Sequence, residues 1–152
     1  MKKDFFYVLL QFTLFALYII NWNLGDLHLL GWIKTVFITL TGFGLLVILF
    51  GIINLNENLS PFPTPKRNAT LISHGIYKYV RHPIYSGLII SMFSYALVSE
   101  SIFRIISATL LLLVFYFKSD YEEKKLVERF DEYDDYKKVT GRFFPKRTHK
   151  KS

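Results

Sequence analysis

Residues 84–117 read IYSGLIISMFSYALVSESIFRIISATLLLLVFYF, and this stretch holds two apolar runs separated only by the polar triplet at 99–101. The runs, Ile84 to Val98 and Ile102 to Phe117, are each shorter than the ~20 residues that cross hydrocarbon comfortably. Tyr and Ser flanks extend them toward the headgroups. The stretch therefore predicts a tight helical hairpin in a membrane.

Two further apolar blocks precede this hairpin, at residues 5–20 and 32–55. Hydrophobic residues make up 51% of the 152 residues and concentrate in the four blocks, which is typical of a polytopic membrane protein. We therefore predict an all-α fold in a single membrane domain, residues 1–152, with spans at about 5–22, 32–55, 83–99 and 102–118. Lys2 and Lys3 before the first block also allow a cleaved signal peptide, but the sequence at 21–23 is a poor cleavage site.

Lys and Arg gather in three segments that an even number of spans would place on one side of the membrane. The N-terminus holds two, the link before the hairpin holds four, and the tail from Lys118 onward holds 11, whereas the other connections hold only Lys34 and Arg104. The positive-inside rule makes the rich side cytoplasmic, which predicts cytoplasmic termini in a plasma (inner) membrane. The net charge of +7 then matches a surface beside anionic lipid, and we expect no nucleic-acid partner.

Thiol and metal chemistry are not expected. The chain has no cysteine, which excludes disulfides and cysteine nucleophiles. Its four histidines lack the paired spacing of metal ligands, so no metal site is predicted.

The segment from Gly75 to Gly87, GIYKYVRHPIYSG, brings cations and phenols to the start of the third apolar block. Pro83 suits the first position of a helix, where its fixed φ fits and its missing N–H is not needed. Arg81 and His82 would then lie at a helix N-terminus, which attracts a carboxylate or phosphate. Gly87 leaves room for close approach of a helix or a ligand.

Two other segments flank the apolar blocks. Residues 56–74 are rich in proline, which forbids helix, and we interpret them as an extended spacer along the membrane surface. The tail over 119–138 predicts an amphipathic helix on the cytoplasmic side. Its apolar stripe holds Leu126, Phe130 and Tyr133 and also the acid Glu122. Arg129 shares the stripe, so a salt bridge is one interpretation of Glu122.

Three interpretations of the segment at 75–87 remain open from the residues themselves. The segment could form an interfacial belt of tyrosines and snorkelling cations, a pocket for an anionic lipid, or a cofactor pocket shared with Glu122. S-adenosylmethionine would use every group of such a cofactor pocket. Its carboxylate suits Arg81, its sulfonium suits Glu122 or a tyrosine face, and its adenine suits apolar walls such as Leu71 and Ile72.

The motif Gly-x-Tyr-x-x-x-Arg-His-Pro-x-Tyr-x-Gly at 75–87 resembles the signature of integral-membrane methyltransferases, the isoprenylcysteine carboxyl methyltransferases and related phospholipid N-methyltransferases. The pair Glu122-Glu123 before Leu126 and the segment Arg142-Phe143-Phe144-Pro145 are similar to the family's C-terminal motif. The resemblance covers about residues 55–146.

This resemblance implies S-adenosylmethionine as cofactor, bound by elements at 66–87 and 118–146. It implies contacts to the cofactor from Leu71, Ile72, Tyr77, His82, Pro83, Tyr85 and Glu122. It also implies Arg81, His82 and Glu123 as the catalytic set. Lys118 stands where the isoprenylcysteine branch has a substrate-facing Arg, and a Lys keeps the charge without the bidentate fork.

The expected reaction is methyl transfer from S-adenosylmethionine to a lipophilic or lipid acceptor at the cytoplasmic face. A carboxylate acceptor needs no general base, whereas an amine would lose its proton to Glu123, Tyr85 or His82. One alternative is an NADPH-dependent sterol or enone reductase, but those enzymes usually carry Asn where Ile84 stands and an acid where Leu88 stands. The other is a non-enzymatic lipid-binding scaffold.

Overall fold

The computed structural model describes residues 2–20, 22 and 24–146 and is built from helices. The long helices are α1 (Lys2–Ile20), α2 (Gly31–Leu55), α3 (Pro83–Val98) and α4 (Ile102–Arg129), followed by the short α5 (Tyr133–Val139). Two 3-10 turns, η1 (Asn56–Asn58) and η2 (Gly75–Lys78), lie between α2 and α3. Over the described ranges there is no strand, only two isolated bridges. The predicted all-α class is confirmed.

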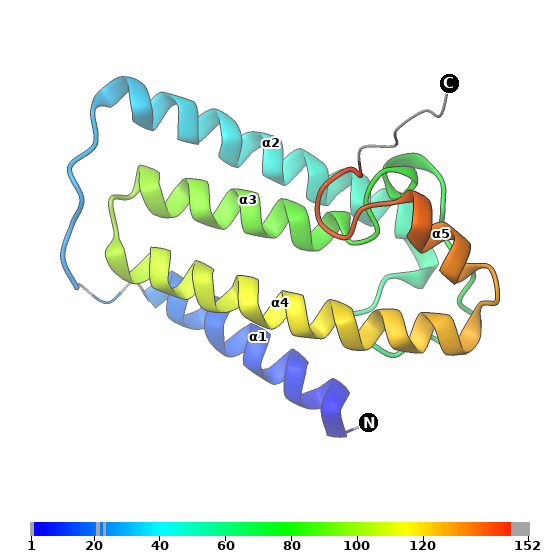
Figure 1. Ribbon diagram of the computed structural model, residues 1–152. Helices are drawn as coiled ribbons and strands as arrows, with labels where there is room; N and C mark the ends of the chain where they lie inside the picture. Colours follow the sequence, from blue (N-terminus) through cyan, green and yellow to red (C-terminus); the bar gives the residue numbers. More distant parts are fainter. Residues whose placement is uncertain (1, 21, 23, 147–152) are drawn as a thin grey trace, which may run out of the picture.

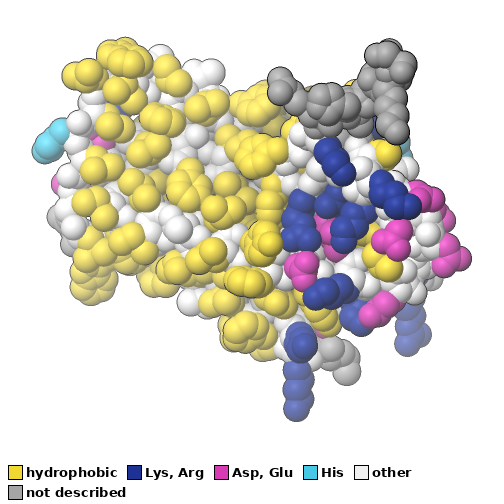
Figure 2. Space-filling model, viewed as in Figure 1, with side chains coloured by type: hydrophobic (Ala, Val, Ile, Leu, Met, Phe, Trp, Pro, Cys, Tyr) yellow, Lys and Arg dark blue, Asp and Glu magenta, His cyan; other side chains and the backbone are white. Residues whose placement is uncertain are grey.

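The four long helices run alternately up and down, with α3 between α2 and α4 and with α1 against α4 (Figure 1). The start of α1 and all of α5 therefore lie at the same end of the bundle, which we call the polar end (Figure 1). Apolar side chains cover most of the visible surface, and charged ones gather at the polar end (Figure 2). A surface of this kind faces lipid rather than water.

Three of the helices, α1, α2 and α4, are long and apolar enough to cross a membrane. The fourth, α3, has 16 residues, so at about 1.5 Å per residue it is shorter than the hydrocarbon core of about 30 Å. It is sheltered between its neighbours, and Ser86, Ser91 and Ser94 are buried in it. The chain is a helical membrane protein, and its third apolar helix is shorter than a typical span.

Glycines bring α2 and α3 into close contact. A Cβ added to Gly87 would lie 2.6 Å from the carbonyl oxygen of Gly44, and one added to Gly44 would lie 2.8 Å from the carbonyl oxygen of Gly87. Small residues at such a crossing let two backbones approach in a membrane, where packing drives association. The expected close approach at Gly87 is therefore confirmed, with α2 as its partner.

Helix α3 begins at Pro83, as its sequence predicts, and His82 precedes it as the N-cap. The turn to α4 follows at once. Glu100 adopts a positive φ of 54° there, and the Ser101 side chain caps α4 by accepting a hydrogen bond from the Arg104 N–H at 3.2 Å. The polar triplet thus forms the tight hairpin expected from it.

The helix predicted over 119–138 forms in two pieces. Its first part is a continuation of α4, which runs unbroken from the apolar segment to Arg129. Phe130 then leaves the helical region with φ −124° and ψ 109°, and Tyr133 starts α5. Phe130 and Tyr133 therefore do not extend the stripe of one straight helix. The break turns α5 back toward η2 (Figure 1).

Candidate functional site

The polar end is held together by pairing between the start of α3 and the segment after α5. The Arg81 N–H donates to the Gly141 carbonyl at 2.8 Å, and the His82 N–H donates to the Arg142 carbonyl at 3.1 Å. The Ser86 hydroxyl donates to the Phe143 carbonyl at 2.7 Å. The C-terminal segment is thereby fixed beside the Arg-His-Pro motif.

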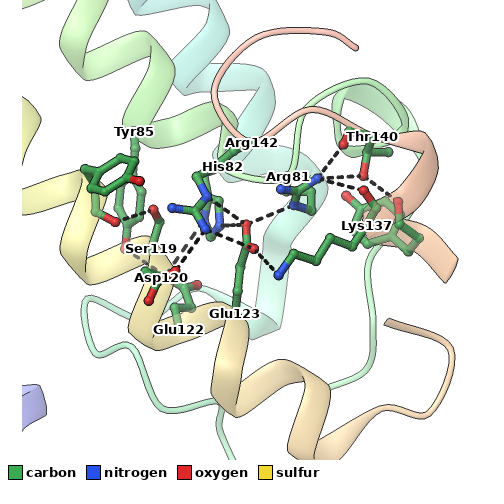
Figure 3. Close-up of polar contacts among 12 residues, drawn as sticks. Arg81, His82, Tyr85, Ser119, Asp120, Glu122, Glu123, Lys137, Thr140 and Arg142 are labelled. Atoms are coloured by element: carbon green, nitrogen blue, oxygen red, sulfur yellow. Dashed lines mark hydrogen bonds and ion pairs between the residues drawn. The ribbon is translucent and has the colours of Figure 1, made fainter. Parts of the chain in front are cut away.

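Glu123 lies at the centre of a buried ionic cluster, with 1% of its surface exposed. Its Oε1 lies 2.9 Å from Arg81 Nε, 3.2 Å from His82 Nε2 and 3.3 Å from Arg142 Nε, and its Oε2 lies 3.1 Å from Lys137 Nζ. Figure 3 shows these side chains converging on the carboxylate. A buried charge needs such partners. These four side chains stabilise the Glu123 carboxylate, and the carboxylate in turn fixes their positions.

The Arg81 guanidinium is largely engaged by the protein itself. Besides its bond to Glu123, its Nη1 donates to the carbonyl oxygens of Lys137 and Thr140 (Figure 3). Arg81 therefore joins three elements: the segment before α3, α4 and the end of α5. The planar fork of an arginine allows this simultaneous bonding.

Glu122, the residue before Glu123 on α4, also lies beside His82 but makes different contacts. Its Oε2 accepts a hydrogen bond from the Tyr85 hydroxyl at 3.0 Å and lies 3.9 Å from His82 Nδ1. The Tyr85 ring stacks between the His82 ring, at 5.4 Å, and the Phe115 ring, at 4.8 Å. The His82 ring thus lies between the two carboxylates, with Nε2 toward Glu123 and Nδ1 toward Glu122.

A cavity with two lobes lies beside this stack. The first lobe, about 90 Å³, is walled by the Pro-rich segment, residues 69–72 included, and by α4 and α5. The second lobe, about 310 Å³, extends toward α1 and the start of α3. The two lobes adjoin each other, since both are lined by Leu55, Ser60, Tyr77, Arg81, His82 and Glu122.

The Pro-rich segment is a wall of the cavity as well as a connection. Pro63 is fully buried, and it lines the first lobe together with Phe62 and Pro65. The Thr64 hydroxyl donates to Asp4 Oδ1 at 2.6 Å, which ties the segment to the start of α1. The expected role of these prolines as a spacer is therefore incomplete, because they also line the cavity.

The second lobe contains a buried cation. Lys118 is 1% exposed, donates from Nζ to Gln11 Oε1 at 2.5 Å and lies 5.3 Å from the centre of the Tyr85 ring. Within the described part of the chain, no carboxylate lies within ion-pair distance of it. A neutral amide and a ring face are thus its partners, which leaves its charge open to an anion in the cavity.

Tyrosines of the first lobe are neutral groups. Burial, with a smaller contribution from Glu122, raises the pKa of Tyr77 well above its ordinary value. Burial likewise raises the pKa of Tyr136 to about 12, and its hydroxyl donates to the Tyr77 carbonyl at 2.6 Å. Both phenols are therefore hydrogen-bond donors at neutral pH.

Most residues singled out in the sequence meet at this cavity. Leu71, Ile72, Tyr77, Arg81, His82 and Glu122 line the first lobe, and Tyr85 and Lys118 line the second. Pro83 is buried against Gly51, and Glu123 lies in the ionic cluster, so neither lines the cavity.

The interpretation of Glu122 as half of a salt bridge with Arg129 is wrong. Between these two described residues there is no ion pair, and Arg129 donates to the Arg67 carbonyl instead. Since α4 continues straight through this region, Glu122 faces the cavity, where Tyr85 is its partner.

Some residues of the site are not predicted by the sequence. Lys137 and Thr140 reach Glu123 and Arg81 only because α5 folds back, and Gln11 meets Lys118 from 107 residues away. Arg142 is the exception, since it lies in the C-terminal motif and could have been assigned to the acidic pair. Among the residues described, no three His, Cys, Asp or Glu side chains form a group suited to a metal ion.

These features define an all-helical membrane protein with a two-lobed cavity at the polar end of its bundle. A family model of phospholipid methyltransferases matches residues 32–133, about two thirds of the chain, and the protein belongs to that family. No curated protein matches the chain significantly. The resemblance predicted from the Arg-His-Pro motif and the acidic pair is confirmed.

Proposed function

We propose that this protein transfers a methyl group from S-adenosylmethionine to a lipophilic acceptor, a carboxylate or an amine, at the cytoplasmic face of the membrane. The observation that carries the proposal is the junction of the two lobes. His82 and Glu122 line both of them, so a donor in the first lobe and an acceptor in the second would meet there. The family assignment favours this reaction over a reductase or a scaffold.

The residues of the first lobe fit the methyl donor. Glu122 supplies a negative charge for its cationic part, and Leu71, Ile72 and Leu126 supply apolar walls for its base. When bound, S-adenosylmethionine supplies a methyl group already activated by its sulfonium. The protein then has to align the two reactants and exclude water.

The first lobe, at about 90 Å³, is smaller than most ligand sites. Such sites usually have volumes of roughly 300–1,000 Å³. We infer that the Pro-rich segment moves outward when the donor enters. The hydrogen bonds Thr64–Asp4 and Arg129–Arg67 are among the contacts that tie this segment to α1 and α4. When the Pro-rich segment closes again, it would cover the bound reactants and exclude water.

The second lobe suits the acceptor. Ile84 and Leu88 give it an apolar wall next to the bilayer, and Lys118 offers a cation for a carboxylate or phosphate of the acceptor. If the acceptor is an amine, His82 Nδ1 faces the junction and is able to take its proton, while Glu123 holds the other ring nitrogen.

Arg81 and Glu123 act in this proposal as positioning residues. Their side chains bind each other and the end of α5, which fixes the His82 ring and the lobe wall formed by α5. The proposal also retains the orientation expected from the charges. The polar end faces the cytoplasm of a plasma (inner) membrane, with both termini on that side.

Isothermal titration calorimetry with S-adenosylmethionine tests the proposal on the full chain in detergent micelles. The wild-type protein should bind the donor, and the Arg81→Ala variant should bind it much more weakly because the lobe wall loses its anchor. An absence of binding by the wild-type protein would contradict the proposal. Mass spectrometry of lipids from cells with and without the protein would then identify the methylated acceptor.

A further inference from the structure

Tyr133, the first residue of α5, is a buried residue with an unusual feature. Its side chain is 1% exposed, and among the described residues its hydroxyl is the one buried side-chain polar atom without a hydrogen-bond partner. Burial without a partner is costly for a polar group, and most such groups in proteins are satisfied. An exception therefore needs an explanation.

The position of Tyr133 offers one. The residue lines the first lobe together with Glu122, Tyr77 and Leu126. Its ring is held by an edge contact with Tyr136, at 5.7 Å between centroids, and its N–H donates to the Phe130 carbonyl at 3.0 Å. These contacts hold the ring and the backbone of Tyr133 in place beside the lobe.

Its neighbour Tyr136 makes the contrast clear. Both phenols lie on α5, one turn apart, and both line the first lobe; Tyr133 is buried and Tyr136 is partly buried. The Tyr136 hydroxyl donates to the Tyr77 carbonyl at 2.6 Å, whereas the Tyr133 hydroxyl has no such acceptor. Burial, with a smaller contribution from Glu123, raises the pKa of Tyr133 well above its ordinary value, so the group keeps its proton and acts as a donor.

We propose that the Tyr133 hydroxyl is a ligand-binding group that donates a hydrogen bond to an oxygen or nitrogen acceptor of the methyl donor in the first lobe. This inference rests on the proposed function and adds a residue to it. The free protein carries an unsatisfied donor, and ligand binding supplies the missing acceptor. The Tyr133 hydroxyl therefore lowers the stability of the ligand-free protein and raises its affinity for the methyl donor.

That trade predicts opposite effects from one substitution. Tyr133→Phe removes the unsatisfied hydroxyl and keeps the ring, so the ligand-free protein should unfold at the same temperature as the wild type or at a higher one. The affinity for the donor should fall about tenfold, as expected for one lost hydrogen bond in a buried site. Tyr136→Phe is the matched control. It removes a satisfied hydroxyl, so it should lower the unfolding temperature of the ligand-free protein.

The experiment measures thermal unfolding and calorimetric binding of the full chain in detergent micelles, with S-adenosylhomocysteine as the probe because it binds without turnover. A Tyr133→Phe variant that binds the probe as tightly as the wild type would overturn the inference. So would a variant that unfolds at a lower temperature without ligand or fails to fold, because the hydroxyl would then have a structural partner. If the wild type itself does not bind, the proposed function fails first and the inference falls with it.

Discussion

The Nε atom of Arg81 lies 2.9 Å from Oε1 of Glu123, and this pair joins the start of α3 to α4 across 42 positions of sequence. Both side chains are buried, at 7% and 1% exposed. Lys137 and Arg142 bind the same carboxylate from the C-terminal segment. One acid thus fixes the arrangement of three elements around the cavity.

Substituting this acid should therefore unfold the polar end. Glu123→Gln leaves the buried Arg81 guanidinium without its anion and weakens the contacts of the partly exposed Arg142 and Lys137. Breaking a buried pair in this way costs about 3–5 kcal/mol. The thermal unfolding temperature in detergent should fall sharply. Asp120→Asn is the control, because Asp120 binds Arg142 from a half-exposed position, and it should change stability little. Equal effects of the two substitutions would show that Glu123 is not the centre of the cluster.

Substituting Lys118 should weaken binding of the acceptor and leave binding of the methyl donor unchanged. Lys118→Met removes the buried cation of the second lobe and preserves its apolar stem, so the KM for an anionic acceptor should rise about tenfold or more. Donor affinity, measured separately by calorimetry, should stay unchanged because Lys118 does not line the first lobe. Lys124→Met is the control on the exposed face of α4. Loss of donor affinity in Lys118→Met would contradict the separation of the two lobes.

The contact between α2 and α3 gives a prediction that is independent of function. Gly87→Ala places a methyl group 2.6 Å from the Gly44 carbonyl, and overpacking of this kind costs typically about 1–3 kcal/mol. Gly42→Ala, on the same helix as Gly44, meets nothing within 4 Å and should be neutral or stabilising by about 0.5–1 kcal/mol. Chemical denaturation of both variants measures the difference. Similar stabilities would contradict the close packing.

Movement of the Pro-rich segment should depend on Thr64. Thr64→Val removes the hydrogen bond to Asp4 and preserves the shape of the side chain. Amide hydrogen exchange over residues 59–72 should become faster, because the segment opens more often. The donor should also associate faster, as stopped-flow fluorescence would show. Unchanged exchange and association would mean that the segment is a fixed wall.

The sequence predicts the parts of the fold that depend on local signals. The apolar runs, the polar triplet between α3 and α4 and Pro83 each indicate a helix or its boundary without reference to distant residues. The Arg-His-Pro motif and the acidic pair likewise identify residues that meet at the cavity.

What the sequence does not predict depends on contacts between distant residues. Nothing between Lys118 and Lys138 breaks a helix locally, since the segment has no glycine or proline. The break at Phe130 is stabilised by α5 packing back, where Tyr136 reaches Tyr77. The pairing of Gln11 with Lys118 has no local pattern either, and an unsatisfied hydroxyl such as that of Tyr133 becomes visible only in three dimensions.

The central claim, methyl transfer at the junction beside Glu122, is tested most directly by radiolabelled methyl transfer from S-adenosylmethionine into lipid extracts. Purified wild-type protein and the variants Glu122→Gln and Glu128→Gln would be compared; Glu128 lies exposed on the same helix and pairs with Lys125. We predict label in the lipid fraction with the wild type and with Glu128→Gln, and a large loss with Glu122→Gln. Equal labelling by Glu122→Gln, or none by the wild type, would contradict the claim.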